Sequence, residues 1–229
     1  MFSLKNKIAI VTGSKGGVGK AIYDSFKKAG TKVYGLDIKD GFDIMDTVER
    51  EQFFVDNIKR LDILVNCAGI TYRNRISETF KDEEWNKTLE MNLTAPFRMC
   101  QCAFPFMRNK GGSIINITSI WCDIVLFNNP PYGASKGGLQ VMGKALALDW
   151  GKYGIRVNNI GLGFFKTDMT KDTWSNSKHL KKREARIPLG RAGVPKDVVG
   201  TAIFLASDAS KYITGADIYV DGGWKINGV

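Results

Sequence analysis

Lys7 to Gly19 read K-I-A-I-V-T-G-S-K-G-G-V-G, a short apolar run followed by a glycine-rich stretch. The run up to Val11 is rich in β-branched residues and predicts a buried strand. Glycines at positions 13, 17 and 19 allow a tight turn, and they let backbone N–H groups approach a pyrophosphate at the start of a helix expected from about Lys20 to Ala29. The spacing is G-x-x-x-G-x-G, which taken alone is also compatible with a plain strand–helix connection.

The segment after this helix supplies a second part of a nucleotide site. Lys32 to Leu36 predicts another strand, and Asp37 follows it directly. A carboxylate at the end of this strand can accept hydrogen bonds from both ribose hydroxyls of an adenosine. Strand, glycine turn, helix, strand and acid in this order predict a nucleotide-binding half.

Four polar residues further along the chain have the spacing of an acid–base catalyst. Tyr132 follows Ser119 by thirteen residues, Lys136 ends the string Y-G-A-S-K, and Asn92 lies upstream in M-N-L. A gap of four residues places the phenol and the ammonium on one face of a helix. The nearby positive charge favours the phenolate, so the pair can exchange a proton with an alcohol or a carbonyl. Y-x-x-x-K alone is equally typical of an amphipathic helix face.

Together these motifs resemble the short-chain dehydrogenase/reductase family. The family string T-G-x-x-x-G-x-G corresponds to Thr12–Gly19, and N-N-A-G corresponds to Asn66–Gly69 with Cys67 in place of the second Asn. The catalytic Tyr and Lys of the family correspond to Tyr132 and Lys136. The match runs in order along nearly the whole chain and is therefore specific.

The same resemblance extends through the second half of the chain. V-N-N-I-G-L-G-F-F-K-T resembles the family string V-N-x-I-x-P-G-x-x-x-T and ends at Thr167, with Leu162 in place of the usual proline. That departure implies a looser loop on the nicotinamide side. Gly193–Trp224 resembles the carboxy-terminal part of the family. The implied fold is an α/β Rossmann-type doubly wound parallel sheet in three layers, forming a single NAD(P)-binding domain over residues 1–229.

The resemblance also implies roles for individual residues. Tyr132 would exchange the proton while a hydride moves between nicotinamide and substrate, and Lys136 would lower the pKa of Tyr132 and hold the ribose. Ser119 would bind the reacting oxygen, and Asn92 would anchor a water that relays protons. The implied cofactor contacts, besides Tyr132 and Lys136, are Gly13, Ser14, Lys15, Gly17, Val18, Gly19, Asp37, Ile38, Asp43, Ile44, Asn66, Ala68, Gly69, Gly163, Phe165 and Thr167.

The acid at position 37 bears on the choice between NAD and NADP. A 2′-phosphate beside the Asp37 carboxylate would bring like charges together, which costs affinity. Relatives that use NADP usually carry Arg or Lys just before the second motif glycine or just after the second strand, where this chain has Gly16 and Ile38. Lys15 and Lys39 lie nearby and could soften this rule. The sequence therefore predicts NAD, with NADP as the alternative.

Hydrophobic runs and turn residues predict the remaining elements. Residues 37–62 are too few for a full helix and strand before the next helix, so we expect a shortened third strand near Phe42–Ile44 and one helix over about residues 46–59. Pro96 predicts a kink in a helix over about residues 82–107. The other expected strands are Asp62–Asn66, Ser113–Thr118, Arg156–Gly161 and Asp217–Val220, and further helices are expected over 132–150 and 195–206.

The composition fits one domain without a membrane segment. A chain of 229 residues is long enough for one large α/β core. No apolar run approaches the roughly eighteen residues that a membrane helix needs, and no signal-peptide core precedes the first strand. The cysteines at 67, 100, 102 and 122 are interpreted as buried free thiols of a reducing compartment, so we expect a cytoplasmic protein without a metal site.

The chain carries a formal net charge of +10, and its densest basic run is Lys178–Arg183. No nucleic-acid motif accompanies this run, so we expect neither a nucleic-acid nor a membrane partner. The run is either a solvated helix face or the source of a field that attracts an anionic substrate. It belongs to a polar segment, residues 164–187, which we expect to be a mobile lid over the site.

The substrate is less well defined than the reaction. The tail after residue 185 resembles gluconate 5-dehydrogenases and deoxygluconate dehydrogenases, and similar tails occur in surface-sugar oxidoreductases and acyl-carrier-protein ketoreductases. We expect the pocket to be lined by Thr71, Tyr72 and Arg73, by residues 121–129 and by the lid. The lining residues that suit a polyhydroxy acid or an anionic sugar are Arg73, Asn128, Asn129 and the lid lysines. Candidates that suit an apolar ligand equally well are Trp121, Phe127, Phe164 and Phe165.

These patterns favour an oxidoreductase that transfers a hydride between NAD(H) and a secondary alcohol or ketone of a sugar acid, polyol or surface-sugar precursor. The alternatives are a 3-oxoacyl-(acyl-carrier-protein) reductase-like enzyme and a non-catalytic nucleotide-sensing or nucleic-acid-binding protein on the same fold. The intact tetrad argues against a non-catalytic protein. The resemblance further implies a homotetramer, in which helices over 82–107 and 133–150 pair through apolar residues including Trp85, Leu89, Phe97, Leu139, Leu146 and Trp150.

Overall fold

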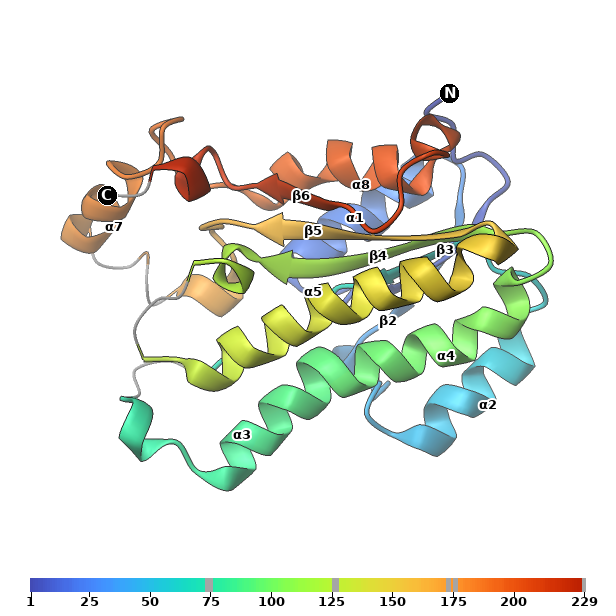
Figure 1. Ribbon diagram of the computed structural model, residues 1–229, viewed down its shortest axis with the longest axis horizontal. Coiled ribbons are helices and arrows are strands. Elements are labelled where there is room, and N and C mark those ends of the chain that lie inside the picture. Colours follow the sequence, from blue (N-terminus) through green and yellow to red (C-terminus); the bar gives the residue numbers. More distant parts are fainter. Residues whose placement is uncertain (73–75, 125–127, 172–173, 175–176, 228–229) are drawn as a thin grey trace.

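The computed structural model describes residues 1–72, 76–124, 128–171, 174 and 177–227. Its centre is one parallel sheet of six strands in the order β2-β1-β3-β4-β5-β6 (Figure 1). Rows of buried, largely apolar residues explain the four central strands, whereas the edge strands β2 and β6 are mostly half-buried. The strands are β1 Ile8–Thr12, β2 Lys32–Leu36, β3 Ile63–Asn66, β4 Gly112–Ser119, β5 Ile155–Leu162 and β6 Asp217–Val220.

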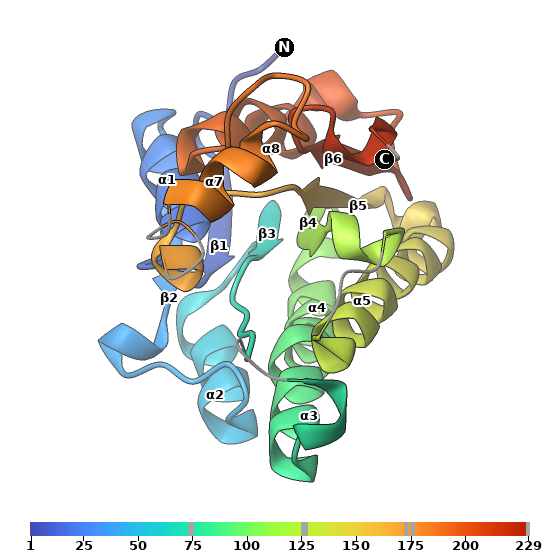
Figure 2. The same cartoon turned by 90° about the vertical axis from the view of Figure 1, so that its left-hand side faces the viewer.

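Helices cover both faces of the sheet. α1 and α8 pack on one face, where Ile22, Phe26 and Leu205 join a buried cluster with the strands. α2, α4 and α5 pack on the other face, around Phe54 and Met99 (Figures 1 and 2). These three layers confirm the predicted doubly wound α/β fold. The helices are α1 Gly17–Lys28, α2 Thr47–Asn57, α3 Asp82–Leu89, α4 Ala95–Met107, α5 Pro130–Trp150, α7 Ser177–Glu184 and α8 Val199–Ala206.

The strand order places a switch point between β1 and β3. The chain moves outward from β1 to β2 and then returns to the other side of β1 to form β3. The loops after β1 and β3 therefore leave the sheet in opposite directions, and ligands of such sheets bind in the crevice outside the carboxyl ends of the strands. Thr12, Asp37, Asn66 and Ser119 all lie at this edge, each at or directly after the end of its strand.

The expected short strand near Phe42–Ile44 is wrong. Residues 38–46, all of which the structure describes, form a 3-10 helix over Ile38–Asp40 and then irregular turns. Local contacts satisfy the backbone here: the Asp37 side chain accepts the N–H of Lys39 at 2.9 Å, and Gly41 adopts a left-handed φ of 85°. With these groups used in turns, β2 remains an edge strand of the sheet.

The long helix expected over residues 82–107 is divided rather than simply kinked. α3 and α4 are joined by a π-helical turn at Glu90–Thr94. Pro96 lies just inside α4 and has no N–H to donate to the carbonyl four residues earlier, which is that of Asn92. A wider turn at this point accommodates the missing donor, and it places the Asn92 side chain in the interior, fully buried.

A row of polar side chains crosses the sheet beneath α5. Asn66, Asn116, Asn159 and Asp217 are register partners on four neighbouring strands. Asn66 donates to Asn116 at 2.9 Å, Asn116 donates to Asn159 at 3.1 Å, and Asn159 donates to Asp217 at 2.8 Å. Gly143 of α5 leaves room for this row, since a Cβ there would lie 2.5 Å from the Asn159 oxygen. The row therefore fixes strand register through buried polar contacts.

Candidate active site

The turn after β1 can be built only with glycine at its key positions. Gly13 has a φ of 69°, and a Cβ there would lie 2.9 Å from the backbone of Ala68. A Cβ on Gly19 would lie 2.1 Å from the carbonyl oxygen of Gly13, and one on Gly17 would lie 2.8 Å from Thr167. The start of α1 therefore sits close to the loops after β3 and β5, as a pyrophosphate cradle at a helix N-terminus requires. Of the other predicted residues here, Val18 packs its side chain into the core on the α1 face.

Two hydroxyls link this turn to its neighbours. Thr12 Oγ1 accepts the backbone N–H groups of Cys67 at 3.0 Å and Ala68 at 3.1 Å, which joins the end of β1 to the turn after β3. Ser14 Oγ is buried and has no hydrogen-bond partner among the described residues. It lies against β2, 2.6 Å from where a Cβ on Gly35 would be. The glycine turn and its buried hydroxyl fit a dinucleotide, which would approach mainly the backbone.

Asp37 is held at the end of β2 with 8% of its surface exposed. Its two carboxylate oxygens accept the backbone N–H groups of Lys15 at 2.8 Å and Lys39 at 2.9 Å. The Lys15 ammonium lies 3.1 Å from Asp40. The hydrogen bond to Asp40 raises the pKa of Lys15 above its usual value. The nearest basic side chain of the turn therefore pairs with another acid.

The residues predicted to flank an adenine have unequal access to it. Ile38 follows Asp37 and is 64% exposed, so its side chain can pack against an adenine ring. Ile44 is 4% exposed and packs in the core, while its carbonyl accepts a hydrogen bond from the buried Arg50 guanidinium at 2.8 Å. The Asp43 carboxylate accepts the N–H of Met45 at 2.9 Å. Asp43 and Ile44 thus shape this end of the crevice mainly through the turn that they form.

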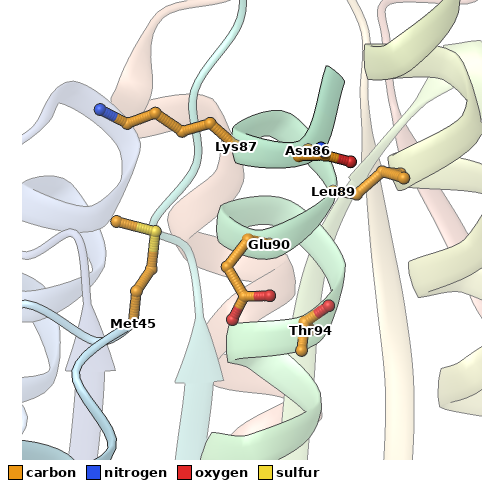
Figure 3. Close-up of a pocket in the computed structure, with 6 residues that line it drawn as sticks. All are labelled: Met45, Asn86, Lys87, Leu89, Glu90 and Thr94. Carbon is orange, nitrogen blue, oxygen red and sulfur yellow. The ribbon is translucent and has the colours of Figure 1, made fainter. Parts of the chain in front are cut away.

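A pocket adjoins this turn (Figure 3). Met45 forms one side of it, and the helix from α3 into the π-helical turn forms the other. Lys87 and Glu90 supply opposite charges at its wall. The residues that line the pocket are Met45, Asn86, Lys87, Leu89, Glu90 and Thr94, and they include none of the predicted catalytic residues.

Tyr132 and Lys136 lie together on α5, as their spacing predicts. The Lys136 ammonium lies 5.9 Å from the centroid of the Tyr132 ring and donates a hydrogen bond to the carbonyl of Ile117 at 2.8 Å. Burial lowers the pKa of Lys136 below its ordinary value. Gly69 lies close to the ammonium: a Cβ there would lie 3.6 Å from it and 3.1 Å from the Asn92 side-chain oxygen. A buried cation therefore stands between the phenol and the turn after β3.

Ser119 ends β4 on the same side of the sheet. It is 5% exposed, and its Oγ accepts the N–H of Trp121 at 3.2 Å, which caps a short 3-10 helix, η4, over Ile120–Cys122. The Trp121 ring stands edge-on to the Tyr132 ring at 5.6 Å. The hydroxyl proton of Ser119 remains available to an oxygen acceptor in the site, because the contact with Trp121 uses the oxygen as acceptor.

The Asn92 side chain makes hydrogen bonds to two walls of the site. Its amide donates to the carbonyl of Ile70 at 2.9 Å and to the Ser135 hydroxyl at 3.1 Å, and its oxygen accepts the N–H of Ile70 at 2.8 Å. These bonds join the loop after β3 to α5. Asn92 therefore holds the walls of the site together, and its role in anchoring a relay water stays a prediction.

The residues predicted on the nicotinamide side lie after β5. Gly163 approaches Asp221 so closely that a Cβ would lie 2.7 Å from the Asp221 Cα. Phe165 is 5% exposed in the core on the α1 face, so it can reach a cofactor only through its backbone. The Thr167 hydroxyl shares a hydrogen bond with Thr170 at 3.1 Å. Leu162 ends β5 as a register partner of Ser119 and Val220. The looser loop expected from the replacement of proline by leucine stays a prediction.

One polar side chain on the predicted substrate side has an unused acceptor. Asn129 donates to the Thr71 hydroxyl at 2.7 Å and to the Tyr72 carbonyl at 3.0 Å. Its own carbonyl oxygen is buried and has no partner among the described residues. Buried polar atoms are almost always hydrogen-bonded, so this oxygen can accept a bond from a water or a ligand. Arg73 and Phe127, also predicted here, lie outside the described residues.

The segment predicted as a lid is anchored where the structure describes it. The Phe164 ring packs on Trp224 at 4.5 Å, and the Arg183 guanidinium lies 4.8 Å from the same ring. Glu184, at the end of α7, forms an ion pair with Lys166 at 3.1 Å. α7 and the C-terminal residues lie at the end of the sheet where the strands finish (Figure 1).

The described ranges lack the features of a membrane-spanning helix and of a metal site. They contain no helix whose length and hydropathy suit a membrane span. Nor do they bring three or more His, Cys, Asp or Glu side chains together as metal ligands. All four cysteines are free thiols. Burial raises the pKa of Cys67 and of Cys100 to about 12, so both stay protonated near neutral pH.

A glycine turn after β1, an acid after β2 and a Ser-Tyr-Lys cluster after β4 define an NAD(P)-dependent oxidoreductase that acts on CH–OH groups. The chain belongs to the short-chain dehydrogenase/reductase family, since a family model described as enoyl-(acyl carrier protein) reductase matches residues 7–225. This assignment confirms the predicted family.

Known proteins of this family match the chain over almost its whole length. It is 34% identical to an NAD-dependent glycerol dehydrogenase of Listeria innocua, over 98% of the chain and 96% of the relative. It is 37% identical to a 3-oxoacyl-[acyl-carrier-protein] reductase of Rickettsia bellii, over 97% and 98%. The structure of a gluconate 5-dehydrogenase of Burkholderia cenocepacia, in complex with NADP and tartrate, matches with a TM-score of 0.92 and 27% identity, over 98% and 97%.

Proposed function

We propose that the protein transfers a hydride between NAD(H) and a secondary alcohol or ketone of a sugar acid or polyol. The observation that carries the proposal is the cluster of Ser119, Tyr132 and Lys136 beside the glycine turn, with the unused Asn129 oxygen nearby in the chain. The cluster supports the reaction class. The Asn129 oxygen supports a substrate rich in hydroxyl groups, because it can accept a hydrogen bond that an acyl chain cannot donate.

In this proposal each member of the cluster has one task. Tyr132 accepts the proton of the alcohol during oxidation and returns it to the carbonyl oxygen during reduction. The buried Lys136 ammonium stabilises the phenolate form by its charge. Ser119 donates its hydroxyl proton to the reacting oxygen and stabilises charge that develops there. The nicotinamide, when bound, supplies or accepts the hydride. Gly13, Gly17, Gly19 and Asp37 would hold the dinucleotide that carries it.

NAD is the proposed cofactor. Asp37 places a carboxylate where the adenosine ribose would bind, and Lys15 is paired with Asp40. A 2′-phosphate would therefore meet negative charge without a free Lys15 ammonium to balance it. The Burkholderia cenocepacia relative was crystallised with NADP, so the comparison of the two cofactors on this chain is the relevant test.

Ketoreductase activity on acyl thioesters is the second candidate. Aromatic contacts near the site favour it: the Phe164 ring contacts Trp174 and Trp224, and the Trp121 ring stands edge-on to Tyr132. Such rings suit an apolar chain as well as they suit the carbon face of a sugar. The reductase from Rickettsia bellii belongs to the same set of relatives.

A screen of turnover separates these candidates. NADH absorbance would be followed with gluconate, glycerol and threitol in the oxidative direction and with acetoacetyl-thioester in the reductive direction, each with NAD(H) and NADP(H). We expect turnover of a hydroxylated substrate with NAD. Turnover of the thioester alone would establish the second candidate, and no turnover of any substrate by a folded, NAD-binding protein would contradict both.

We also propose that one domain over residues 1–229 assembles as a homotetramer, with residues 164–187 as its lid. Leu148 and Val141 of α5 are 85% and 63% exposed, which supports a helix-to-helix contact between subunits. Leu139 and Leu146, predicted for this contact, are 1% and 6% exposed in the chain's own core. Sedimentation of wild type and Leu148→Glu tests the assembly: a wild-type monomer at micromolar concentration would refute it. The cytoplasmic location stays a prediction.

A further inference from the structure

The η4 turn touches the proposed catalytic residues at three points. It begins where Ser119 Oγ accepts the N–H of Trp121. The Trp121 ring then meets the Tyr132 ring edge-on, with an interplanar angle of 87°. The thiol of Cys122 donates to the carbonyl of Lys136 at 3.1 Å. A displacement of this turn would therefore disturb contacts with all three catalytic residues, with Lys136 through its backbone.

Asp123 anchors the turn on its far side. Its carboxylate accepts a hydrogen bond from the Tyr219 hydroxyl on β6 and forms an ion pair with Lys225. The Lys225 ammonium also lies 3.8 Å from the centroid of the Tyr219 ring. The Tyr219 hydroxyl in turn accepts a hydrogen bond from Gln140 of α5 at 3.0 Å. Residues from three separate parts of the chain thus converge on one carboxylate.

The ionisation states of this group agree with its contacts. Partial burial works against the charge of Asp123, but hydrogen bonds from Lys225 and Tyr219 outweigh it and hold the pKa of Asp123 below its usual value. Burial, together with the bond to Asp123, raises the pKa of Tyr219. The carboxylate therefore stays charged and the phenol stays a donor at neutral pH, so the contacts are charge-assisted.

The position of the Tyr219 ring depends on Gly161. These residues are register partners on β6 and β5. A Cβ on Gly161 would lie 2.5 Å from two carbons of the ring, so only glycine lets the ring lie across β5 at this place. The Asp221 carboxylate then accepts the N–H groups of Gly223 at 2.9 Å and Lys225 at 2.8 Å. This turn directs Lys225 back toward Asp123.

We propose that Asp123, Tyr219 and Lys225 form a clamp that positions the η4 turn, and that the clamp sets substrate selectivity by fixing Trp121 as a wall of the substrate pocket. The three residues act through Trp121, so they are positioning residues. The selectivity part rests on the proposed function, whereas the clamp itself does not. It follows that residues near the C-terminus take part in choosing the substrate.

Alkylation of Cys122 tests the clamp without any substrate. Asp123→Asn, Tyr219→Phe and Lys225→Met would be labelled with iodoacetamide and each cysteine followed by peptide mass spectrometry, with Tyr212→Phe at a fully exposed tyrosine as control. We expect Cys122 to react about tenfold faster in the clamp variants, the order expected for losing one charge-assisted hydrogen bond. The buried Cys100 should react no faster than in wild type.

Two labelling results would overturn the clamp. Unchanged Cys122 reactivity in all three variants would show that Asp123 does not hold the turn. Equal acceleration of Cys122 and Cys100 would show that the contacts serve only overall stability.

Selectivity is tested with Tyr219→Phe on gluconate and glycerol. We expect the ratio of the two kcat/KM values to change several-fold, mainly through KM, with the Kd for NAD unchanged. If Cys122 is labelled faster but the ratio of the two kcat/KM values is unchanged, the proposal that the clamp sets substrate selectivity is overturned. If wild type turns over neither alcohol, the proposed substrate class is wrong, and the labelling result still decides the clamp.

Discussion

The backbone N–H of Lys15 donates a hydrogen bond to the Asp37 carboxylate at 2.8 Å, and this contact joins the glycine turn after β1 to the end of β2. The second oxygen of the carboxylate accepts the N–H of Lys39. Two backbone donors therefore fix the orientation of the acid before any ligand binds. Because backbone groups rather than lysine side chains hold Asp37, its negative charge is only partly balanced.

Replacing Asp37 should change cofactor preference. Asp37→Ala removes both the acceptor for the ribose hydroxyls and the charge that opposes a 2′-phosphate. We expect NAD affinity to fall by about tenfold or more, the order for losing a hydrogen bond to a charged group, and NADP affinity to rise. Titration of both cofactors by fluorescence or calorimetry measures this, with Asp24→Ala on the exposed side of α1 as control. A wild type that already prefers NADP would contradict the proposed role.

Tyr132→Phe should abolish turnover and leave cofactor binding nearly intact. The substitution removes only the hydroxyl, and loss of a general acid–base group typically costs about 10² to 10⁴ in rate. Steady-state kinetics and the Kd for NAD separate the two effects. Tyr212→Phe, at a fully exposed position, should match wild type. Normal turnover of Tyr132→Phe would rule out the proposed acid–base residue.

Gly19→Ala should damage the glycine turn. A Cβ at this position would lie 2.1 Å from the Gly13 carbonyl oxygen, so the backbone must shift. We expect NAD binding to be lost and the free energy of unfolding to fall by about 1–3 kcal/mol, as for other overpacked sites.

Gly200→Ala is the matched control for this substitution. Gly200 lies in α8, where a Cβ would have open space within 4 Å. This change should raise the free energy of unfolding by roughly 0.5–1 kcal/mol, because alanine restricts the unfolded chain. Denaturant unfolding measures the free energy of unfolding of both variants. Equal changes in the two would mean that the close contact of position 19 with the Gly13 carbonyl does not determine the effect of Gly19→Ala.

Exposed lysines of α7 should affect the capture of an anionic substrate. Lys181 and Lys182 are exposed, whereas Arg183 packs on Phe164 and is left in place. Lys181→Gln with Lys182→Gln should raise KM for gluconate more than for glycerol and weaken the salt dependence of kcat/KM. Lys27→Gln with Lys28→Gln removes the same charge at the far end of α1. Identical kinetics for the two double variants would indicate that α7 is only a solvated basic face.

Stability should fall at alkaline pH because of buried thiols. The pKa of Cys100 rises from 9.0 to about 12 on burial, so between these values the folded state binds more protons than the unfolded state. The free energy of unfolding then decreases with pH by about 1.4 kcal/mol per pH unit for each such thiol. Cys100→Ala should reduce this slope above pH 9 in denaturant titrations. An unchanged slope would show that Cys100 does not contribute.

The sequence determined the elements that depend on local patterns. Glycine spacing, apolar runs and the Tyr132–Lys136 interval are properties of short segments, so the parallel sheet and the main cluster could be predicted from them. The strands Lys32–Leu36 and Asp217–Val220 have the predicted bounds. The prediction of a strand at Phe42–Ile44 was wrong, because the backbone on either side of this segment forms turn hydrogen bonds to the Asp37 and Asp43 side chains instead of pairing with a strand.

Tertiary structure decided what depends on contacts between distant segments. Asn66, Asn116, Asn159 and Asp217 form one row only because four strands share a register, and recurring polar residues near strand ends were the only sign of it. Asp123 meets Tyr219 and Lys225 across about a hundred positions of chain. The residues of one segment are enough to favour a helix or a strand there. Contacts between side chains that are distant in the sequence depend on how all the segments pack together, so no single segment predicts them.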